Sequence, residues 1–470
     1  MSVSQLVLDA TFLTSAGIGG AGPDDHAIAG MADAARRALE ITRTRRDKGE
    51  IGFLDLPEDR ASARACMDFA RALEPQIDTV VTLGIGGSSL GPRALYSALA
   101  PAFDQLAPRS AGMPRRMFFA DNVDPVTFGA LLDRVPLDRV LWNVVSKSGA
   151  TAETCAQFLV VADRLDKKLG AEKARNRIAI TTDPVNGALR AIANEKGYHA
   201  FSIPPSVGGR FSALTSVGLV PAACAGLDIM GILDGAARMR DRCLVPELAK
   251  NPALLLASLL HHHHIVRGRP IHVMMPYADG LYDTADWFRQ LWAESLGKEK
   301  STDGRTINVG PTPVAARGAT DQHSQLQLYV EGPDDKVYLV LSVANRGAEI
   351  KIPGGELAKS QPDLAYLAGH GLGELLDAEL RGMTSSLARR HRPLVRLTLA
   401  KLSAEALGEL IMLLEATVAF AGPLYGVDPF DQPGIEEAKR MAFAALGRSG
   451  YEALALEMSK MPGPDRKYVL

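Results

Sequence analysis

Cysteine is scarce in this sequence, with four residues in a chain of 470: Cys66, Cys155, Cys224 and Cys243. No two of them have the C-x-x-C spacing of many metal and redox sites. A small secreted protein held together by disulfides would use cysteine far more densely. The four scattered residues therefore favour a reduced, cytoplasmic protein, and Cys155 and Cys224 lie in apolar stretches that are typical of a core.

An excess of charge of one sign is also lacking. The 52 basic and 54 acidic residues nearly cancel, to a net charge of −2. This balance argues against nucleic acid or a strongly anionic surface as partner, although it permits a local basic site. The first residues, "MSVSQLVLDATFLTS", show no basic start followed by a long apolar run, so we expect no signal peptide. No apolar run approaches the ~18 residues that span a bilayer, so we expect no membrane partner.

Apolar, β-branched runs alternate along the chain with amphipathic helical stretches. The runs lack strict alternation of polar and apolar residues, which is typical of parallel strands covered on both faces. We expect strands within residues 78–86, 115–122, 139–147, 177–183 and 199–203, and, after a helical section, within 270–278, 336–343 and 393–400. The pattern predicts an α/β protein with two units in tandem and mainly parallel sheets.

Four segments are expected from this pattern. A helical N-terminal segment covers residues 1–50, the first α/β unit 51–235, the second unit 236–420, and a helical C-terminal arm 421–470. No long linker separates the two units, which favours a fixed arrangement with a small-molecule cleft between them.

The stretch "GIGGSSLGP", residues 84–92, joins a predicted strand to a predicted helix. It fits neither the G-x-G-x-x-G turn of dinucleotide sites nor the G-x-x-x-x-G-K-[ST] loop of nucleotide triphosphate sites. Its glycines let backbone amides approach an anion, Ser88 and Ser89 supply hydroxyl donors, and the helix N-terminus adds its dipole. The pattern favours phosphate binding at this turn. The alternative is a tight turn without a ligand.

A second stretch, "VSKSGATAET", residues 145–154, has the same layout. Ser146, Ser148 and Thr151 are hydroxyl residues, and Lys147 adds a charge. The alternative is ordinary capping of a helix by Ser148 or Thr151. Because both turns follow strands of one parallel sheet, they could meet around one phosphate monoester.

Five motifs together resemble the glucose-6-phosphate isomerase (phosphoglucose isomerase) family of the bacterial type. They are "GIGGSSLGP", "SKSGATAET", "VGGRFSALTSVGL", "WAESLGK" and "GATDQHSQLQLYVEGP". The first two resemble the phosphate-binding turns of sugar isomerase (SIS) domains in general, whereas the combination in this order is highly specific. The resemblance covers roughly residues 50–445.

This resemblance implies two tandem SIS-type α-β-α sandwich domains followed by a helical C-terminal arm. The implied reaction is the reversible interconversion of D-glucose 6-phosphate and D-fructose 6-phosphate, through ring opening and a cis-enediol, in glycolysis and gluconeogenesis. The implied enzyme needs no metal or organic cofactor. It works in the cytoplasm as a homodimer with active sites at the subunit interface.

The resemblance also implies roles for individual residues. Glu294 matches the base that moves the proton between carbon 2 and carbon 1, and Arg210 matches the group that stabilises the developing charge. His323 matches the ring-opening histidine, which in the family reaches in from the partner subunit, and Lys439 matches a C-terminal catalytic lysine. Without the resemblance, each residue has an ordinary interpretation. Glu294 would be a solvated glutamate on a helix, and Arg210 would be one partner of a surface ion pair. His323 would be a structural histidine, and Lys439 a solvated lysine on a helix. The implied substrate contacts are Gly87, Ser88, Ser146, Lys147, Ser148, Thr151, Gln290 and Gln432.

Two rival functions stay open at this level. One is a different SIS-domain enzyme, acting on mannose 6-phosphate or glucosamine 6-phosphate; no early cysteine is present to support glutamine hydrolysis. The other is a non-catalytic phosphosugar sensor, but the first fifty residues are too short and too weakly basic for a DNA-binding module. The histidine run at residues 261–264 is interpreted as polar residues closing a helix rather than as a metal site, because adjacent histidines on a helix point to different sides.

Overall fold

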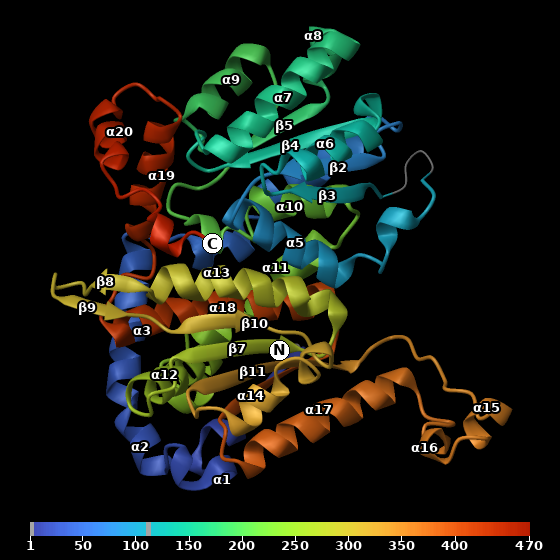
Figure 1. Ribbon diagram of the computed structural model, residues 1–470, viewed down its shortest axis with the longest axis vertical. Helices are drawn as coiled ribbons and strands as arrows, with labels where there is room; N and C mark the ends of the chain where they lie inside the picture. Colours follow the sequence, from blue (N-terminus) through green and yellow to red (C-terminus); the bar gives the residue numbers. More distant parts are fainter. Residues whose placement is uncertain (1–3, 110–113) are drawn as a thin grey trace.

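The computed structural model describes residues 4–109 and 114–470, and its strands form two five-stranded sheets and one two-stranded ribbon (Figure 1). The first sheet contains β2 (Thr79–Leu83), β3 (Arg116–Ala120), β4 (Val140–Ser146), β5 (Ile178–Thr182) and β6 (His199–Ser202). The second contains β1 (Leu6–Asp9), β7 (Ile271–Pro276), β10 (Thr312–Ala315), β11 (Lys336–Asn345) and β12 (Leu394–Lys401). The ribbon pairs β8 (Lys298–Lys300) with β9 (Thr306–Val309).

The longer helices lie between and after the strands. Those of the first half are α3 (Ala32–Asp47), α4 (Arg60–Ala72), α5 (Gly87–Leu99), α6 (Pro125–Arg134), α7 (Ala152–Leu169), α9 (Ala188–Lys196), α10 (Ser216–Cys224) and α11 (Ile229–Cys243). Those of the second half are α12 (Pro252–Ile265), α13 (Tyr282–Leu296), α17 (Leu372–Arg389), α18 (Ala404–Tyr425), α19 (Gly434–Ala445) and α20 (Glu452–Ser459). Short helices include α1 (Ser15–Ile18), α2 (Asp25–Gly30), α8 (Ala171–Arg175), α14 (Leu326–Glu331), α15 (Glu356–Lys359) and α16 (Pro362–Ala365).

The first sheet has the order β3-β2-β4-β5-β6, and all of its neighbouring strands are parallel. Its two faces are covered by different helices. On one face, α7 packs Phe158 and Val161 against Trp142 of β4. On the other, Tyr96 of α5 packs with Leu141. The expected α-β-α layering is therefore present, and the apolar runs lack alternation because both faces are buried.

The second sheet has the order β1-β12-β11-β7-β10. Strands β12, β11, β7 and β10 run parallel to one another. Strand β1 pairs antiparallel with β12, with Leu6 opposite Leu399. Residues 6–9 therefore depart from the expected helical N-terminal segment. Helix α17 covers one face of the sheet through Met383 and Leu387, and the other face belongs to the main core.

Helices α13 and α18 lie between the two sheets, where Figure 1 shows them running across the middle of the molecule. Helix α13 contacts both α5 of the first half and α18 of the second. The fold class predicted from the sequence, mainly parallel α/β with a helical C-terminal region, is confirmed. What this arrangement achieves for the site is that residues of α13 face the strand-to-helix turns of the first sheet.

Helix α18 is long and apolar enough to cross a membrane by length and composition, so the expectation of no such run is wrong for this segment. In the structure, 89% of its apolar window is buried inside the protein. A helix that is apolar all round and buried on all sides is a core helix.

Candidate active site

The first glycine-rich turn joins β2 to α5. Gly86 adopts a φ of 58° and caps the helix, a conformation that glycine adopts without strain. A Cβ on Gly87 would lie 2.1 Å from the carbonyl oxygen of Gly209, so only glycine fits against the loop that carries Arg210. Within the described chain the Ser88 hydroxyl has no protein partner, which leaves it available to a ligand.

The second turn joins β4 to α7 and gathers three hydroxyl groups. The Ser146 Oγ lies 2.8 Å from Thr151 Oγ1 and 3.4 Å from Ser148 Oγ. Thr151 stands at the N-cap of α7, yet its side chain makes no cap hydrogen bond. The hydroxyls therefore face one another at a helix N-terminus, an arrangement suited to an anion. Strands β2 and β4 are parallel neighbours, so the two turns leave the same edge of the sheet.

Lys147 points away from this hydroxyl group. Its Nζ donates to the carbonyl oxygens of Pro205 and Val207, each at 2.8 Å. Burial lowers the pKa of the Lys147 ammonium, and nearby Asp183 opposes that shift. The side chain thus ties the second turn to the loop that leads into Arg210.

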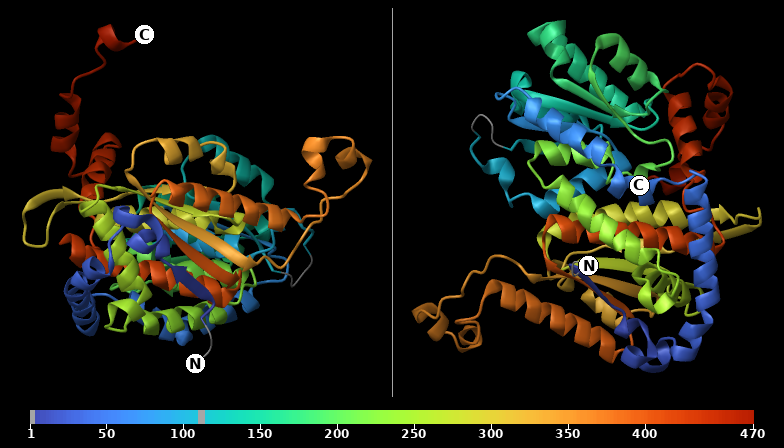
Figure 2. Two further views of the ribbon diagram at one scale, coloured as in Figure 1. Left: turned by 90° about the horizontal axis from the view of Figure 1, so that it is seen from below. Right: turned by 180° about the vertical axis from the view of Figure 1, so that it is seen from behind.

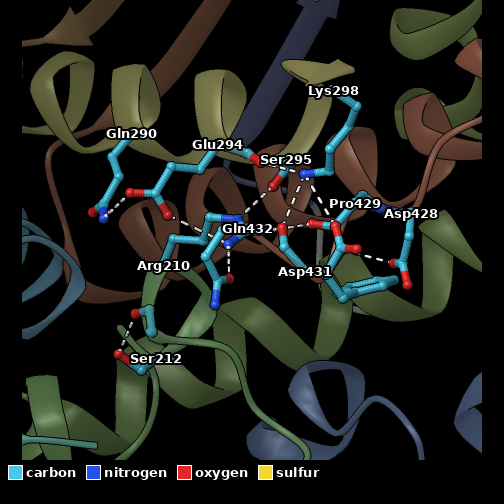
Figure 3. A network of polar contacts seen from close by, with 12 residues as sticks. Arg210, Ser212, Gln290, Glu294, Ser295, Lys298, Asp428, Pro429, Asp431 and Gln432 are labelled. Atoms are coloured by element: carbon cyan, nitrogen blue, oxygen red, sulfur yellow. Dashed lines mark hydrogen bonds and ion pairs between the residues drawn. The ribbon is translucent and has the colours of Figure 1, made fainter. Parts of the chain in front are cut away.

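Glu294 lies in the last turn of α13, and Gln290 lies one turn earlier on the same face (Figure 3). The Gln290 Nε2 donates to Glu294 Oε1 at 2.9 Å. Gln290 Nε2 is also the atom that a Cβ on Gly86 would approach, at 2.9 Å. The Glu294 carboxylate, 27% exposed, is therefore held next to the first glycine-rich turn.

Arg210 lies beneath this carboxylate with a side chain that is 1% exposed. Its Nη1 is 3.4 Å from Glu294 Oε2, and its Nε donates to Ser295 Oγ at 2.7 Å. Its Nη2 donates to the carbonyl oxygens of Pro429 and Asp431. Burial lowers the pKa of the Arg210 guanidinium, an effect opposed by the charge of Glu294. An arginine remains charged even so, and here it is rigidly fixed.

The segment between α18 and α19 completes the cluster. Gln432 Oε1 accepts from Arg210 Nη1 at 2.8 Å, so one guanidinium nitrogen serves both Gln432 and Glu294. Sequence reasoning missed four members of this network, Ser295, Lys298, Pro429 and Asp431. The first two lie in the "WAESLGK" motif itself, which was the available signal; Pro429 and Asp431 lie just before Gln432.

His323 and Lys439 lie apart from this cluster. His323 is exposed and lines a separate cavity of about 440 Å³ with Asp279, Thr320 and Arg346. Lys439, in α19, pairs with Glu436 at 2.9 Å. Among the residues that the structure describes, neither side chain contacts Glu294 or Arg210. Within one chain, Glu294 and Arg210 therefore contact each other, whereas His323 and Lys439 each lie elsewhere.

The histidine run lies in the last turn of α12 and is more deeply embedded than a helix-closing role requires. Arg269 Nη1 donates to His263 Nδ1 at 2.9 Å, so His263 Nε2 carries the proton and donates to the carbonyl of Leu13. His264 Nδ1 contacts the Tyr425 hydroxyl at 2.9 Å. These contacts are structural. In residues 4–109 and 114–470, no group of three or more His, Cys, Asp or Glu side chains is placed to hold a metal ion.

Comparison with known proteins identifies the relatives of this chain. The family model described as phosphoglucose isomerase matches residues 68–449. A glucose-6-phosphate isomerase from Rubrobacter xylanophilus is 45% identical over 86% of this chain and 90% of its own length. One from Carboxydothermus hydrogenoformans is 41% identical over 92% of this chain and 93% of its own.

Solved structures agree with these matches. A hypothetical protein from Thermus thermophilus superimposes with a TM-score of 0.84 at 36% identity, over 94% of this chain and 99% of its own. A glucose-6-phosphate isomerase from Chlamydia trachomatis shares the fold, with a TM-score of 0.81 at 22% identity, over 98% of this chain and 90% of its own. The family model spans both the two hydroxyl-rich turns and the Glu294–Arg210 pair, and we conclude that this chain belongs to the phosphoglucose isomerase family.

Proposed function

We propose that the protein is a glucose-6-phosphate isomerase, an aldose–ketose isomerase that interconverts D-glucose 6-phosphate and D-fructose 6-phosphate in glycolysis and gluconeogenesis. The observation that carries this proposal is the Glu294 carboxylate, held by Gln290 and faced by a buried guanidinium beside a phosphate-type turn. Membership of the family supports the same reaction. The free thiols of all four cysteines support a cytoplasmic location.

The substrate phosphate is assigned to the two turns. The hydroxyls of Ser88, Ser146, Ser148 and Thr151 and the helix N-termini of α5 and α7 are donors that suit a phosphate monoester. Gly87 keeps the backbone close to the loop of Arg210. Lys147 contributes by joining the second turn to that loop, since its ammonium is already bonded to two carbonyls.

Proton transfer is assigned to Glu294. The carboxylate takes the proton from carbon 2 of the open-chain aldose and returns it to carbon 1 of the cis-enediol. The reverse reaction runs through the same two steps. Such a base needs a fixed position and a path to the substrate. Gln290 supplies the first by its hydrogen bond to Oε1, and the partial exposure of the carboxylate supplies the second.

Charge stabilisation is assigned to Arg210. As the proton leaves carbon 2, negative charge develops on the oxygens of the enediol, and a preorganised cation in a water-poor site stabilises it most effectively. Four hydrogen-bond acceptors hold the guanidinium before substrate arrives: Ser295, Gln432 and the carbonyls of Pro429 and Asp431. Nη1 is the nitrogen that faces the Glu294 carboxylate.

Ring opening is assigned to His323 of a partner subunit together with Lys439. The separation of His323 from Glu294 within one chain supports a site completed by a second copy. So does the arm formed by residues 346–371, which projects from the body of the protein (Figure 2). That arm exposes Leu357 (80%) and Tyr366 (70%), apolar surface typical of an interface. We therefore propose a homodimer with shared active sites.

The function is tested by supplying purified protein with fructose 6-phosphate, excess glucose-6-phosphate dehydrogenase and NADP, and following NADPH absorbance. We expect steady turnover that EDTA does not change, and mannose 6-phosphate is supplied in parallel as the alternative substrate. Glu294→Gln keeps the shape of the side chain but removes the base, so activity should fall by about a hundredfold or more. Glu299→Gln, an exposed carboxylate five residues on, is the matched control.

Absence of turnover by the wild-type protein would contradict the proposed function. Turnover that favours mannose 6-phosphate would assign the site to a different epimer. Equal activity of Glu294→Gln and Glu299→Gln would remove Glu294 from the mechanism while leaving the reaction in place.

A further inference from the structure

Lys298 is a buried cation next to the proposed base. It is the first residue of β8, directly after the glycine that ends α13, and its side chain is 5% exposed. Its Nζ donates to the carbonyl oxygen of Glu294 and to that of Asp431, the latter at 2.9 Å. It also forms an ion pair with Asp431 Oδ1 at 3.3 Å. An ammonium has three protons to donate, and here each has an acceptor.

Burial and a neighbouring cation make this position unfavourable for a charged lysine side chain. Burial lowers the pKa of the Lys298 ammonium, and the neighbouring Arg210 cation lowers it further, against the opposing charge of Asp431. Two cations are thus buried side by side. Breaking a buried, fully bonded ion pair is costly, whereas an apolar side chain of similar volume packs as well or better. Packing alone therefore does not account for a charged residue here.

Lys298 connects the end of α13 to the segment between α18 and α19. The Asp431 carbonyl oxygen accepts from both Lys298 Nζ and Arg210 Nη2. The next residue, Gln432, accepts from Arg210 Nη1, and α19, which carries Lys439, begins two residues later. At its other end Lys298 bonds the backbone of Glu294 itself. Figure 3 shows the ammonium between the end of α13 and this C-terminal segment.

We propose that Lys298 is a positioning residue of the isomerase, an inference that rests on the proposed function. Its ammonium joins the last turn of α13 to the segment at residues 428–432, and so fixes Gln432 and the start of α19 relative to Glu294 and Arg210. Lys298 does not touch the substrate; it acts through Asp431 and Gln432.

The test is a double-mutant cycle on isomerase activity. Lys298→Met keeps the length of the side chain and removes the charge. We expect it to lower kcat/KM for fructose 6-phosphate by about tenfold or more, the loss typical of a hydrogen-bonded charge. Gln432→Ala should lower it too. Because both act through one segment, the double variant should be little worse than the poorer single variant. Lys300→Met, an exposed lysine of the same strand, is the matched control and should equal the wild type.

The proposal would be overturned if the fold-loss in kcat/KM of the double variant equalled the product of the two single losses. Wild-type activity of Lys298→Met would overturn it as well. A merely structural lysine would lower the melting temperature and the yield of active protein without coupling to Gln432. If Lys298→Met does not fold, Lys298→Arg, which retains the charge, carries the same cycle: coupling to Gln432→Ala supports the proposal and additivity overturns it. Inactivity of the wild type and of Lys300→Met together would instead contradict the proposed function.

Discussion

At the scale of single residues, the site is organised around Arg210 rather than around the base. The guanidinium bonds to side chains or carbonyls from α13 and from the segment after α18. Trp287 Nε1 also donates to the Arg210 carbonyl at 3.2 Å, which fixes the backbone. A charge that is already oriented does not have to be reorganised as the reaction proceeds, and this is the main source of electrostatic stabilisation in enzymes.

Individual residues of this network were predictable to different degrees. Glu294, Gln290 and Arg210 stand in short motifs, and the structure brings them together. The contacts of Arg210 with Pro429 and Asp431 join positions about two hundred residues apart, and no local pattern records such a pairing. Lys147 was expected to add charge at the phosphate, but its ammonium is bonded to the loop at 205–207, a contact that depends on how two turns meet.

Glu415 is a buried carboxyl group that the proposed mechanism does not use. It lies in α18 with no exposed surface, and neither carboxyl oxygen has a hydrogen-bond partner in the described chain. Burial raises the pKa of Glu415 well above its usual value of 4.5. The folded protein therefore holds this proton to a higher pH than the unfolded chain does.

This predicts a pH-dependent cost in stability. Because the pKa is raised in the folded state, the stability is fully present below the unfolded pKa and is lost as pH rises toward the folded pKa. Glu415→Gln, which is neutral at every pH, should gain stability over the wild type as pH rises above ~5, by up to about 1.4 kcal/mol per pH unit while the folded protein holds the proton. Urea unfolding at pH 5, 6 and 7 measures this difference. Glu40→Gln, on an exposed face of α3, should show none, and a pH-independent difference for Glu415→Gln would contradict the account.

At the scale of elements, burial on both faces made most strands predictable. The strands of the first sheet fall within the expected ranges, as does β7, while β12 continues one residue and β11 two residues beyond the expected range. The missed strands, β1, β8, β9 and β10, are three or four residues long, and β10 contains Pro313. Strand β1 pairs with β12 across almost four hundred residues. Short strands of this kind are specified by their partners rather than by their own sequence.

The two phosphate-type turns show what parallel topology provides. Thr79 of β2 lies opposite Val140 of β4, so the two strands begin level and end at the same edge of the sheet, β4 two residues further on. Helices α5 and α7 begin there, and their N-termini come together without any direct sequence link. This was predictable because neighbouring parallel strands share one edge. The position of α13 against that edge was not, since it depends on the packing of the two units.

At the scale of the whole molecule, the proposed chemistry is divided between a body and its projections. The body carries the turns, Arg210 and Glu294, while the arm at residues 346–371 and the helices α19 and α20 extend from it (Figure 2). His323 and Lys439 lie outside the cluster in one chain. The proposed catalytic set is incomplete in one chain, which agrees with the proposed homodimer, because a two-fold interface contributes to both sites.

Complementation tests this division. In a mixed dimer of Glu294→Gln and His323→Ala chains, one site has both defects and the other has neither. Each variant alone should be nearly inactive, and unfolding and refolding them together in equal amounts should restore about a quarter of wild-type activity, because half of the random dimers are mixed. Mixing Glu294→Gln with the double variant Glu294→Gln/His323→Ala should restore nothing. No recovery in the first mixture would place His323 in the site of its own chain or outside the mechanism.

The central claim is that Glu294 carries the proton between carbon 2 and carbon 1. The most direct measurement is proton NMR of fructose 6-phosphate incubated with the enzyme in D₂O, because a carboxylic acid that has taken a proton exchanges it with solvent before returning it. Wild type and Glu299→Gln should introduce deuterium at carbon 1, and Glu294→Gln should introduce none on the same timescale. Deuterium incorporation by Glu294→Gln at the wild-type rate would contradict the account, because another group would then be moving the proton.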